Sequence, residues 1–194
     1  KGIETGILAM KQVSREFPEA IYLILGLTHP NLVKEEGEKY REYLQGLIAA
    51  NKLENNVRFV NEYLPTRKLM EYLTLTDIYL FTSKDPNQAV SGTFIYAMSA
   101  GCPVISNHFV QAREMLDEKT GIIIEAGNEN QLAGNAIRLL KDDRLRQELG
   151  RNAWLKTRET AWDEVGRKHI DIFYRILGKP ALIPAASTEL SNKE

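Results

Sequence analysis

The sequence predicts an α/β domain with a doubly wound parallel sheet. Apolar runs without polar alternation, which suit strands buried on both faces, alternate along the chain with segments of helical periodicity. Strands that alternate with helices join by right-handed crossovers into a parallel sheet. The composition, 43% hydrophobic and 26% charged over 194 residues, is that of a folded globular chain and excludes disorder for most of it.

The first elements follow from their apolar spacing. Apolar residues recur at helical intervals from Ile3 to Phe17 and stop before Pro18, which predicts a helix. A continuous apolar run at residues 21–25 predicts a strand that ends at Gly26. We then expect a turn at residues 28–30 and a charged helix from about residue 35 to residue 50.

The same signals repeat to the end of the chain. Further strands are expected at residues 57–60, 77–81, 103–106 and 121–124. Further helices are expected at residues 66–73, 91–101, 110–116, 131–140, 144–157 and 163–177. We predict one domain over residues 1–178 and a flexible tail over residues 179–194.

The order of elements begins on a helix, whereas a doubly wound sheet usually begins on a central strand. Without that central strand, the neighbouring strands of the sheet would have unpaired backbone N–H and C=O groups. We therefore expect that a strand and a Gly-rich turn belong before Lys1.

Charge and cysteine content exclude several classes of protein. The net charge of −1 gives no support to a nucleic-acid partner or to contact with an anionic membrane. The single cysteine, Cys102, excludes an intramolecular disulfide and a Cys-rich zinc site, and the three histidines are isolated. No apolar run reaches the roughly 18–20 residues of a membrane span, and no signal-peptide pattern opens the sequence. A cytoplasmic location is expected.

Residues 88–106 carry the clearest functional signal. They comprise a loop, a helix start with Ser91, Gly92 and Thr93, a stop at Gly101, and a strand. Gly92 permits close approach of the backbone to a ligand, and the free N–H groups of a helix start bind phosphate. The alternative is that these residues only cap the helix.

The segment from Tyr96 to Ile105 (Tyr-Ala-Met-Ser-Ala-Gly-Cys-Pro-Val-Ile) is similar to a family motif. It resembles the run Glu-Ala-Met-Ala-x-Gly-x-Pro-Val-Ile of the retaining group 1 glycosyltransferases, in the C-terminal, donor-binding lobe of their GT-B fold, a Rossmann-like domain. Lys1-Gly2 and Arg113-Glu114-Met115 also resemble that family, and the resemblance covers roughly residues 1–176.

Two carboxylates of the family motif are replaced here. The first glutamate, which contacts the donor sugar, falls on Gln88, and the second, which holds the ribose, falls on Tyr96. Gln-Ala-Val-Ser-Gly-Thr at residues 88–93 and Thr-His-Pro at residues 28–30 resemble a subgroup of the family. Gln88 still donates and accepts hydrogen bonds, whereas Tyr96 lacks the charge of a bidentate acceptor.

The resemblance implies a set of donor-binding residues. They are Lys1 and His29, Gln88 and Tyr96, and the run Ser91, Gly92 and Thr93, with Asn61, Glu62 and Tyr63 at the nucleobase. For each, the alternative is an ordinary surface, capping or packing role. No residue is assigned to catalysis, and no metal or cofactor is implied besides the donor substrate.

The resemblance implies transfer of a hexosyl group from a nucleoside diphosphate sugar to an acceptor glycan or lipid. The partners are then the sugar nucleotide, the acceptor, and an N-terminal acceptor lobe that this chain does not contain. We expect the chain alone to be inactive. The alternatives are a non-catalytic nucleotide or sugar binding module of the same fold and a dinucleotide-binding domain, although the latter's Gly-x-Gly-x-x-Gly follows no strand here.

Overall fold

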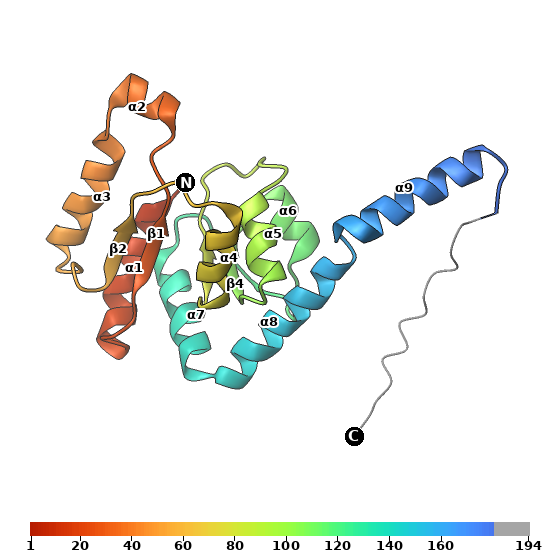
Figure 1. Ribbon diagram of the computed structural model, residues 1–194. Coiled ribbons are helices and arrows are strands. Elements are labelled where there is room, and N and C mark those ends of the chain that lie inside the picture. Colours follow the sequence, from red (N-terminus) through yellow and green to blue (C-terminus); the bar gives the residue numbers. More distant parts are fainter. Residues whose placement is uncertain (181–194) are drawn as a thin grey trace. The chain divides into compact units, whose positions relative to one another are not determined.

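The computed structural model describes residues 1–180, in two compact units (Figure 1). The first is Lys1–Lys156, and the described residues of the second are 157–180. The single domain predicted over residues 1–178 stays a prediction. The tail predicted at residues 179–194 lies, apart from its first two residues, outside the described part.

The first unit alternates helices and strands as predicted. Its helices are α1 (Ile3–Glu16), α2 (Pro30–Glu36), α3 (Lys39–Ala50), α4 (Thr66–Thr74), α5 (Gly92–Ser99), α6 (Val110–Met115), α7 (Glu129–Lys141) and α8 (Asp143–Arg158), which ends just inside the second unit. Its strands are β1 (Tyr22–Leu25), β2 (Val57–Val60), β3 (Tyr79–Phe81), β4 (Val104–Asn107) and β5 (Ile122–Ile124). Every strand pair is parallel, which confirms the predicted fold class.

The five strands pair in two groups. β1 pairs with β2, with Tyr22 opposite Val57, and β4 lies between β3 and β5, with Leu80 opposite Ile105. Among residues 1–180, no strand pairs with the second edge of β1 or of β3. The single sheet expected from the sequence is therefore divided here, and the further strand expected before Lys1 stays a prediction.

The larger of the two cores forms around α1. Ile7, Met10 and Val13 recur at helical spacing and are buried on one face of this helix. The helix packs along α7, whose Leu132 and Leu139 join the same cluster. Each such side chain contributes roughly 1.5–3 kcal/mol when it is fully buried, so this face anchors the start of the chain.

Three phenylalanines form the centre of the second core. The rings of Phe81 and Phe109 stack with centroids 4.4 Å apart, and Phe94 meets them edge-on at 5.7 and 5.2 Å. Phe81 ends β3, Phe109 follows β4, and Phe94 is the third residue of α5. The aromatic cluster thus fixes the start of α5 against the ends of two strands.

The charged helix predicted from about residue 35 is two helices in the structure. His29 caps α2 with Nδ1, which accepts from the N–H of Asn31 at 3.2 Å, and Pro30 occupies the first turn. Gly37 then adopts a left-handed φ of 67°, which ends α2 and lets α3 begin at Lys39. Sequence periodicity missed α2 because none of its residues is buried.

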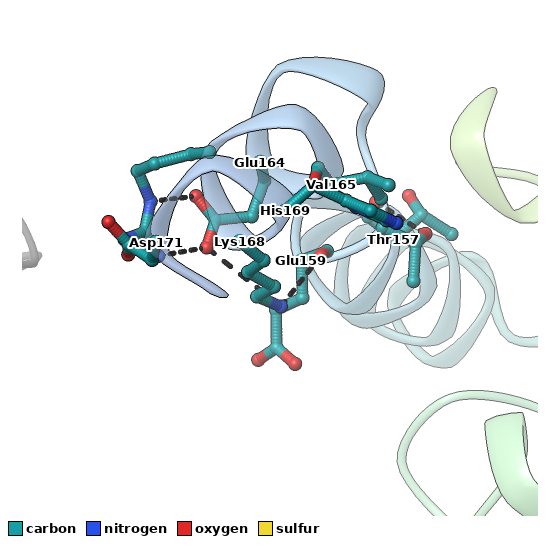
Figure 2. A network of polar contacts seen from close by, with 9 residues as sticks. Thr157, Glu159, Glu164, Val165, Lys168, His169 and Asp171 are labelled. Atoms are coloured by element: carbon teal, nitrogen blue, oxygen red, sulfur yellow. Dashed lines mark hydrogen bonds and ion pairs between the residues drawn. The ribbon is translucent and has the colours of Figure 1, made fainter. Parts of the chain in front are cut away.

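The second unit contains α9 (Trp162–Ile176), whose charged side chains pair with one another. Lys168 reaches the main-chain oxygen of Glu159 at 3.2 Å and the carboxylate of Glu164 at 3.8 Å (Figure 2). Arg167 donates to Glu164 and to Asp171, each at 2.9 Å. These contacts join near neighbours in the sequence and stabilise the helix locally. In the described part of the chain, no helix has both the length and the apolar character that crossing a bilayer requires.

Candidate functional site

The candidate site lies in the first unit, where polar segments follow the strands. Ligands of parallel α/β sheets bind at the carboxyl ends of the strands. Hydrogen bonds and ion pairs join the segments after β1, β2 and β3 to the first turns of α1 and α3. The residues predicted from the sequence thus belong to connected parts of the structure.

The start of α5 combines a capped end with two free N–H groups. Ser91 caps the helix, because its Oγ accepts from the N–H of Phe94 at 3.4 Å, and its own N–H donates to Oε1 of Gln111 at 2.7 Å. Oγ1 of Thr93 accepts from the Tyr79 hydroxyl at 3.0 Å. Among the described residues, no acceptor meets the N–H of Gly92 or of Thr93. These two N–H groups are free to bind an anion.

Gly92 leaves open space at the helix start. A Cβ on Gly92 would have no heavy atom within 4 Å apart from its chain neighbours and the backbone of its own helix. Tyr96 lies four residues on, so its exposed side chain is one turn further along the same side of α5. Ser91 therefore caps the helix, as one prediction states, and the helix start beside Gly92 is still open to a ligand, as the other requires.

Gln88 is bound within its own loop. Its Oε1 accepts from Oγ of Ser83 at 3.1 Å, and its Nε2 donates to the main-chain oxygen of Val90 at 3.1 Å. The amide thereby ties the end of β3 to the residue before Ser91. A glutamate at this position could not donate to the Val90 oxygen, which gives the glutamine a structural reason that the motif comparison does not reveal.

The first residues of the chain lie beside the loop that follows β3. Oγ1 of Thr82 donates to the main-chain oxygen of Lys1 at 3.3 Å. Gly2 has a φ of 67°, and a Cβ on it would lie 2.0 Å from the oxygen of Thr82, so only glycine fits there. The predicted phosphate-contacting Lys1 is thus placed near the loop that contains Gln88, with its side chain exposed.

Sequence reasoning missed a charged cluster beside this loop. The carboxylate of Glu4, on α1, accepts from the Tyr40 hydroxyl at 2.6 Å and pairs with Nζ of Lys84. Burial raises the pKa of Glu4, but the hydrogen bonds from Lys84 and Tyr40 outweigh this effect, and the net pKa is lowered. The pKa of Lys84 is raised by the same carboxylate. No local motif marks these residues, because each belongs to a different element.

Asn107, at the end of β4, is a second residue that the sequence did not single out. It is 3% exposed, and its Nδ2 donates to the main-chain oxygen of Ser83. Within residues 1–180 its Oδ1 is buried without a hydrogen-bond partner. The only sequence signal is a polar residue at the end of an apolar strand, which is too common to be informative.

The predicted nucleobase residues follow β2. Oδ1 of Asn61 accepts from the guanidinium of Arg41, and Glu62 pairs with Lys68. Tyr63 is 83% exposed, so its ring is open for stacking. Arg41, on α3, also donates to Oγ1 of Thr28, in the segment after β1, at 3.2 Å.

His29 has a defined local role in the structure. Its ring nitrogen caps α2, as described above, while its side chain is at the surface. In the described part of the chain, no three His, Cys, Asp or Glu side chains gather as a metal site would require.

Comparison with known proteins identifies similar sequences. A family model described as "Glycosyl transferases group 1" matches residues 1–155. An uncharacterized glycosyltransferase of Methanocaldococcus jannaschii is 24% identical over 181 residues, which cover 91% of this chain and 43% of that protein. The N-acetylgalactosamine-N,N'-diacetylbacillosaminyl-diphospho-undecaprenol 4-alpha-N-acetylgalactosaminyltransferase of Campylobacter jejuni is 30% identical over 97 residues, 49% of this chain and 26% of that enzyme. The chain spans less than half the length of these curated relatives.

Solved structures resemble the fold closely. The C-terminal domain of a glycosyl transferase group 1 family protein from Francisella tularensis superposes with a TM-score of 0.70 at 18% identity, covering 81% of this chain and 77% of that one. Sucrose-phosphate synthase of Thermosynechococcus elongatus gives 0.76 at 23% identity, covering 92% and 43%. HepE of Anabaena, in complex with UDP and glucose, gives 0.73 at 17% identity, covering 88% and 44%. At these identities the likeness concerns the fold.

Proposed function

The chain belongs to the glycosyl transferases of group 1 and has the fold of the C-terminal GT-B lobe, and on this premise we propose that it binds a nucleoside diphosphate sugar at the start of α5. The observation that carries the proposal is the pair of N–H groups of Gly92 and Thr93, which meet no acceptor within residues 1–180 and lie beside open space. They lie in the segment whose sequence resembles the donor-binding motif. A diphosphate there gains from both N–H groups and from the helix dipole.

The same groups would assist the departure of the diphosphate. Transfer breaks the bond between the anomeric carbon and a diphosphate oxygen, and negative charge grows on that oxygen. Fixed N–H donors aimed at the developing charge lower the barrier. The Lys1 ammonium, beside the loop after β3, would add positive charge on the same side.

At the other end of the donor, Asn61, Glu62 and Tyr63 would receive the nucleobase, and His29 would approach the donor from the end of β1. Gln88 and Tyr96 would contact the sugar and ribose from opposite ends of the segment that contains Gly92. UDP is the first nucleotide to test, because the similarly folded HepE was solved with UDP and glucose.

For the whole protein we propose retaining transfer of a hexosyl group to a glycan or lipid acceptor in the cytoplasm. The Campylobacter jejuni relative, whose name describes an acceptor on diphospho-undecaprenol, supports a lipid-linked acceptor. Transfer requires an acceptor lobe to close the site against water. We expect residues 1–194 alone to bind donor without transferring the sugar.

A second candidate function is nucleotide-sugar binding without transfer. The replacement of both motif glutamates by Gln88 and Tyr96 favours it. Activity of the full-length protein separates the two. Sugar transfer by the full-length protein that is lost in a Gly92→Val variant would support the enzyme, and donor binding without any transfer would support the binding module.

Donor binding is tested by a matched pair of glycine variants. UDP, GDP and ADP, with their glucose conjugates, are titrated by calorimetry and by thermal shift, since a ligand of the native state raises its stability by mass action. Gly92→Val places its side chain in the space where the phosphate would lie. We expect the affinity to fall about tenfold or more, as the loss of hydrogen bonds to a charged group implies.

Gly134→Val is the control for this experiment. Gly134 lies in α7, and a Cβ there likewise has no heavy atom within 4 Å. Both variants should fold, and only Gly92→Val should lose the ligand. If both variants bind the diphosphate as the unmodified chain does, or if none of the nucleotides binds the unmodified chain, the assignment of the site to α5 is wrong.

A further inference from the structure

Arg41 is the most extensively bonded side chain near the predicted nucleobase residues. It is the third residue of α3, and its side chain is 14% exposed. Nε donates to Glu38 at 3.1 Å, and Nη2 donates to Oγ1 of Thr28 at 3.2 Å and to the main-chain oxygen of Gly26 at 3.4 Å. Nη1 donates to Oδ1 of Asn61. The guanidinium therefore joins the segment after β1 to the segment after β2.

The ring of Phe59 lies beneath the guanidinium of Arg41. The guanidinium carbon lies 5.2 Å from the ring centroid of Phe59, which is on β2 two residues before Asn61. Thr28 in turn donates to Glu38 at 2.6 Å, so the carboxylate accepts from both Thr28 and Arg41. The hydrogen bond from Thr28 and the neighbouring Arg41 lower the pKa of Glu38. The Glu38 carboxylate is therefore ionised at neutral pH.

The chemistry of this contact determines how Asn61 is oriented. A guanidinium has five N–H donors and no acceptor, so it can meet only the oxygen of an asparagine amide. Oδ1 of Asn61 therefore faces Arg41, and Nδ2 with its two N–H groups is directed away from it. Among the described residues Nδ2 has no acceptor, and Asn61 is exposed. What Asn61 offers to a ligand is a hydrogen-bond donor.

We propose that Arg41 is a positioning residue that locks Asn61 as a donor to a carbonyl oxygen of the nucleobase. The inference rests on the proposed function and adds the class of base. Uracil (O4) and guanine (O6) carry a carbonyl oxygen where adenine carries an exocyclic amine (N6), and the acceptors of adenine are ring nitrogens. A donor held at that position meets an acceptor in uracil or guanine and a second donor in adenine. The site therefore favours UDP or GDP over ADP.

Asn61→Asp removes the donor and keeps the shape. Aspartate still presents an oxygen to Arg41, but it has no N–H for the base. Calorimetry with UDP, GDP and ADP measures the ratio of affinities for the preferred base and for adenine, which cancels the effect of the added charge on the diphosphate. We expect this ratio to fall about two- to tenfold, the worth of one hydrogen bond.

Arg41→Gln tests the positioning role. Glutamine can accept as well as donate, so the Asn61 amide is no longer restricted to one orientation. We expect the ratio of affinities for the preferred base and for adenine to fall in Arg41→Gln as it does in Asn61→Asp. The affinity for inorganic pyrophosphate, which lacks a base, should not change. Arg67→Gln on α4 is the matched control, since Arg67 is 93% exposed and, within residues 1–180, pairs only with Glu71 of its own helix.

The outcomes separate the two proposals. If the unmodified chain binds a diphosphate but shows no preference against adenine, or keeps its preference in Asn61→Asp and Arg41→Gln, the role of Arg41 is refuted and the donor site stands. If Arg41→Gln weakens pyrophosphate as much as nucleotide, Arg41 supports the fold in general and this inference is wrong. If no nucleotide binds the unmodified chain, both proposals fall.

Discussion

The hydrogen bond between Tyr40 and Glu4 offers a direct test of how the candidate site is held together. Tyr40→Phe removes only the hydroxyl, which donates to the Glu4 carboxylate at 2.6 Å. Glu4 also pairs with Lys84, next to Ser83 in the loop that leads to Gln88. Loss of the hydroxyl should therefore weaken both the fold and the attachment of this loop.

The expected magnitude follows from charge and burial. The Glu4 side chain is 14% exposed, so its carboxylate would lose a partner in a poorly hydrated place. A hydrogen bond to a charged group contributes about 1.5–3 kcal/mol, and we expect Tyr40→Phe to lower the free energy of unfolding by that amount at pH 7. Tyr43→Phe, in the same helix and 54% exposed, should change it by less than about 0.5 kcal/mol.

The effect should depend on pH. Because the folded chain lowers the pKa of Glu4 below its ordinary value of 4.5, the carboxylate stabilises the fold above that value and loses this contribution as the pH falls through the lowered pKa. The difference between the unmodified chain and Tyr40→Phe should shrink as the carboxylate is protonated, because a neutral hydrogen bond is worth about 0.5–1.5 kcal/mol.

Urea unfolding, followed by circular dichroism at pH 7 and at pH 3.5, measures both quantities. Combining Tyr40→Phe with Glu4→Gln isolates the pair, and we expect a coupling of at least about 0.5 kcal/mol. A loss below 0.5 kcal/mol at pH 7, a loss that is equal at both pH values, or additive variants would each refute the reasoning.

Two further predictions concern the packing of the first unit. A Cβ on Gly150 would lie 2.1 Å from the main-chain oxygen of Gly101, so Gly150→Ala should lower the free energy of unfolding in urea by about 1–3 kcal/mol. Gly134→Ala, in open space, should raise it by about 0.5–1 kcal/mol. Equal effects would contradict the close approach of α8 to the turn at Gly101. Cys102 is 2% exposed, and burial raises the pKa of its thiol to about 12. Iodoacetamide at pH 8 should therefore leave it unmodified in the folded chain and alkylate it in urea. Equal alkylation rates in both states would show that the thiol is accessible in the folded chain.

The sequence predicted the elements of the first unit well because their signals are local. The run at residues 21–25 lacks polar alternation, and the apolar residues of α1 recur at helical spacing, so each identifies its element without knowledge of any neighbour. The start of α5 was predictable for the same reason, since Ser91, Gly92 and Thr93 are adjacent. Only α2 was missed, because a short exposed helix has no apolar face.

The motif comparison predicted the family, but not what its altered residues do. Gln88 stands where the motif has glutamate, and the sequence alone offered a sugar contact or a surface role. The structure shows its amide joining Ser83 to Val90, a role that needs a donor and an acceptor in one side chain. Such a role depends on the conformation of the loop, which residue types do not specify.

Local sequence thus determined the helices, the strands and the loop that begins the candidate donor site, because periodicity and caps act between residues a few positions apart. The tertiary structure alone decided which distant side chains support that site. Glu4, Tyr40 and Lys84 meet from α1, α3 and the loop after β3, and Arg41 joins the ends of β1 and β2. These pairings form only when the cores around α1 and the three phenylalanines bring the elements together, since the chain between the partners carries no pattern that records which of them will meet.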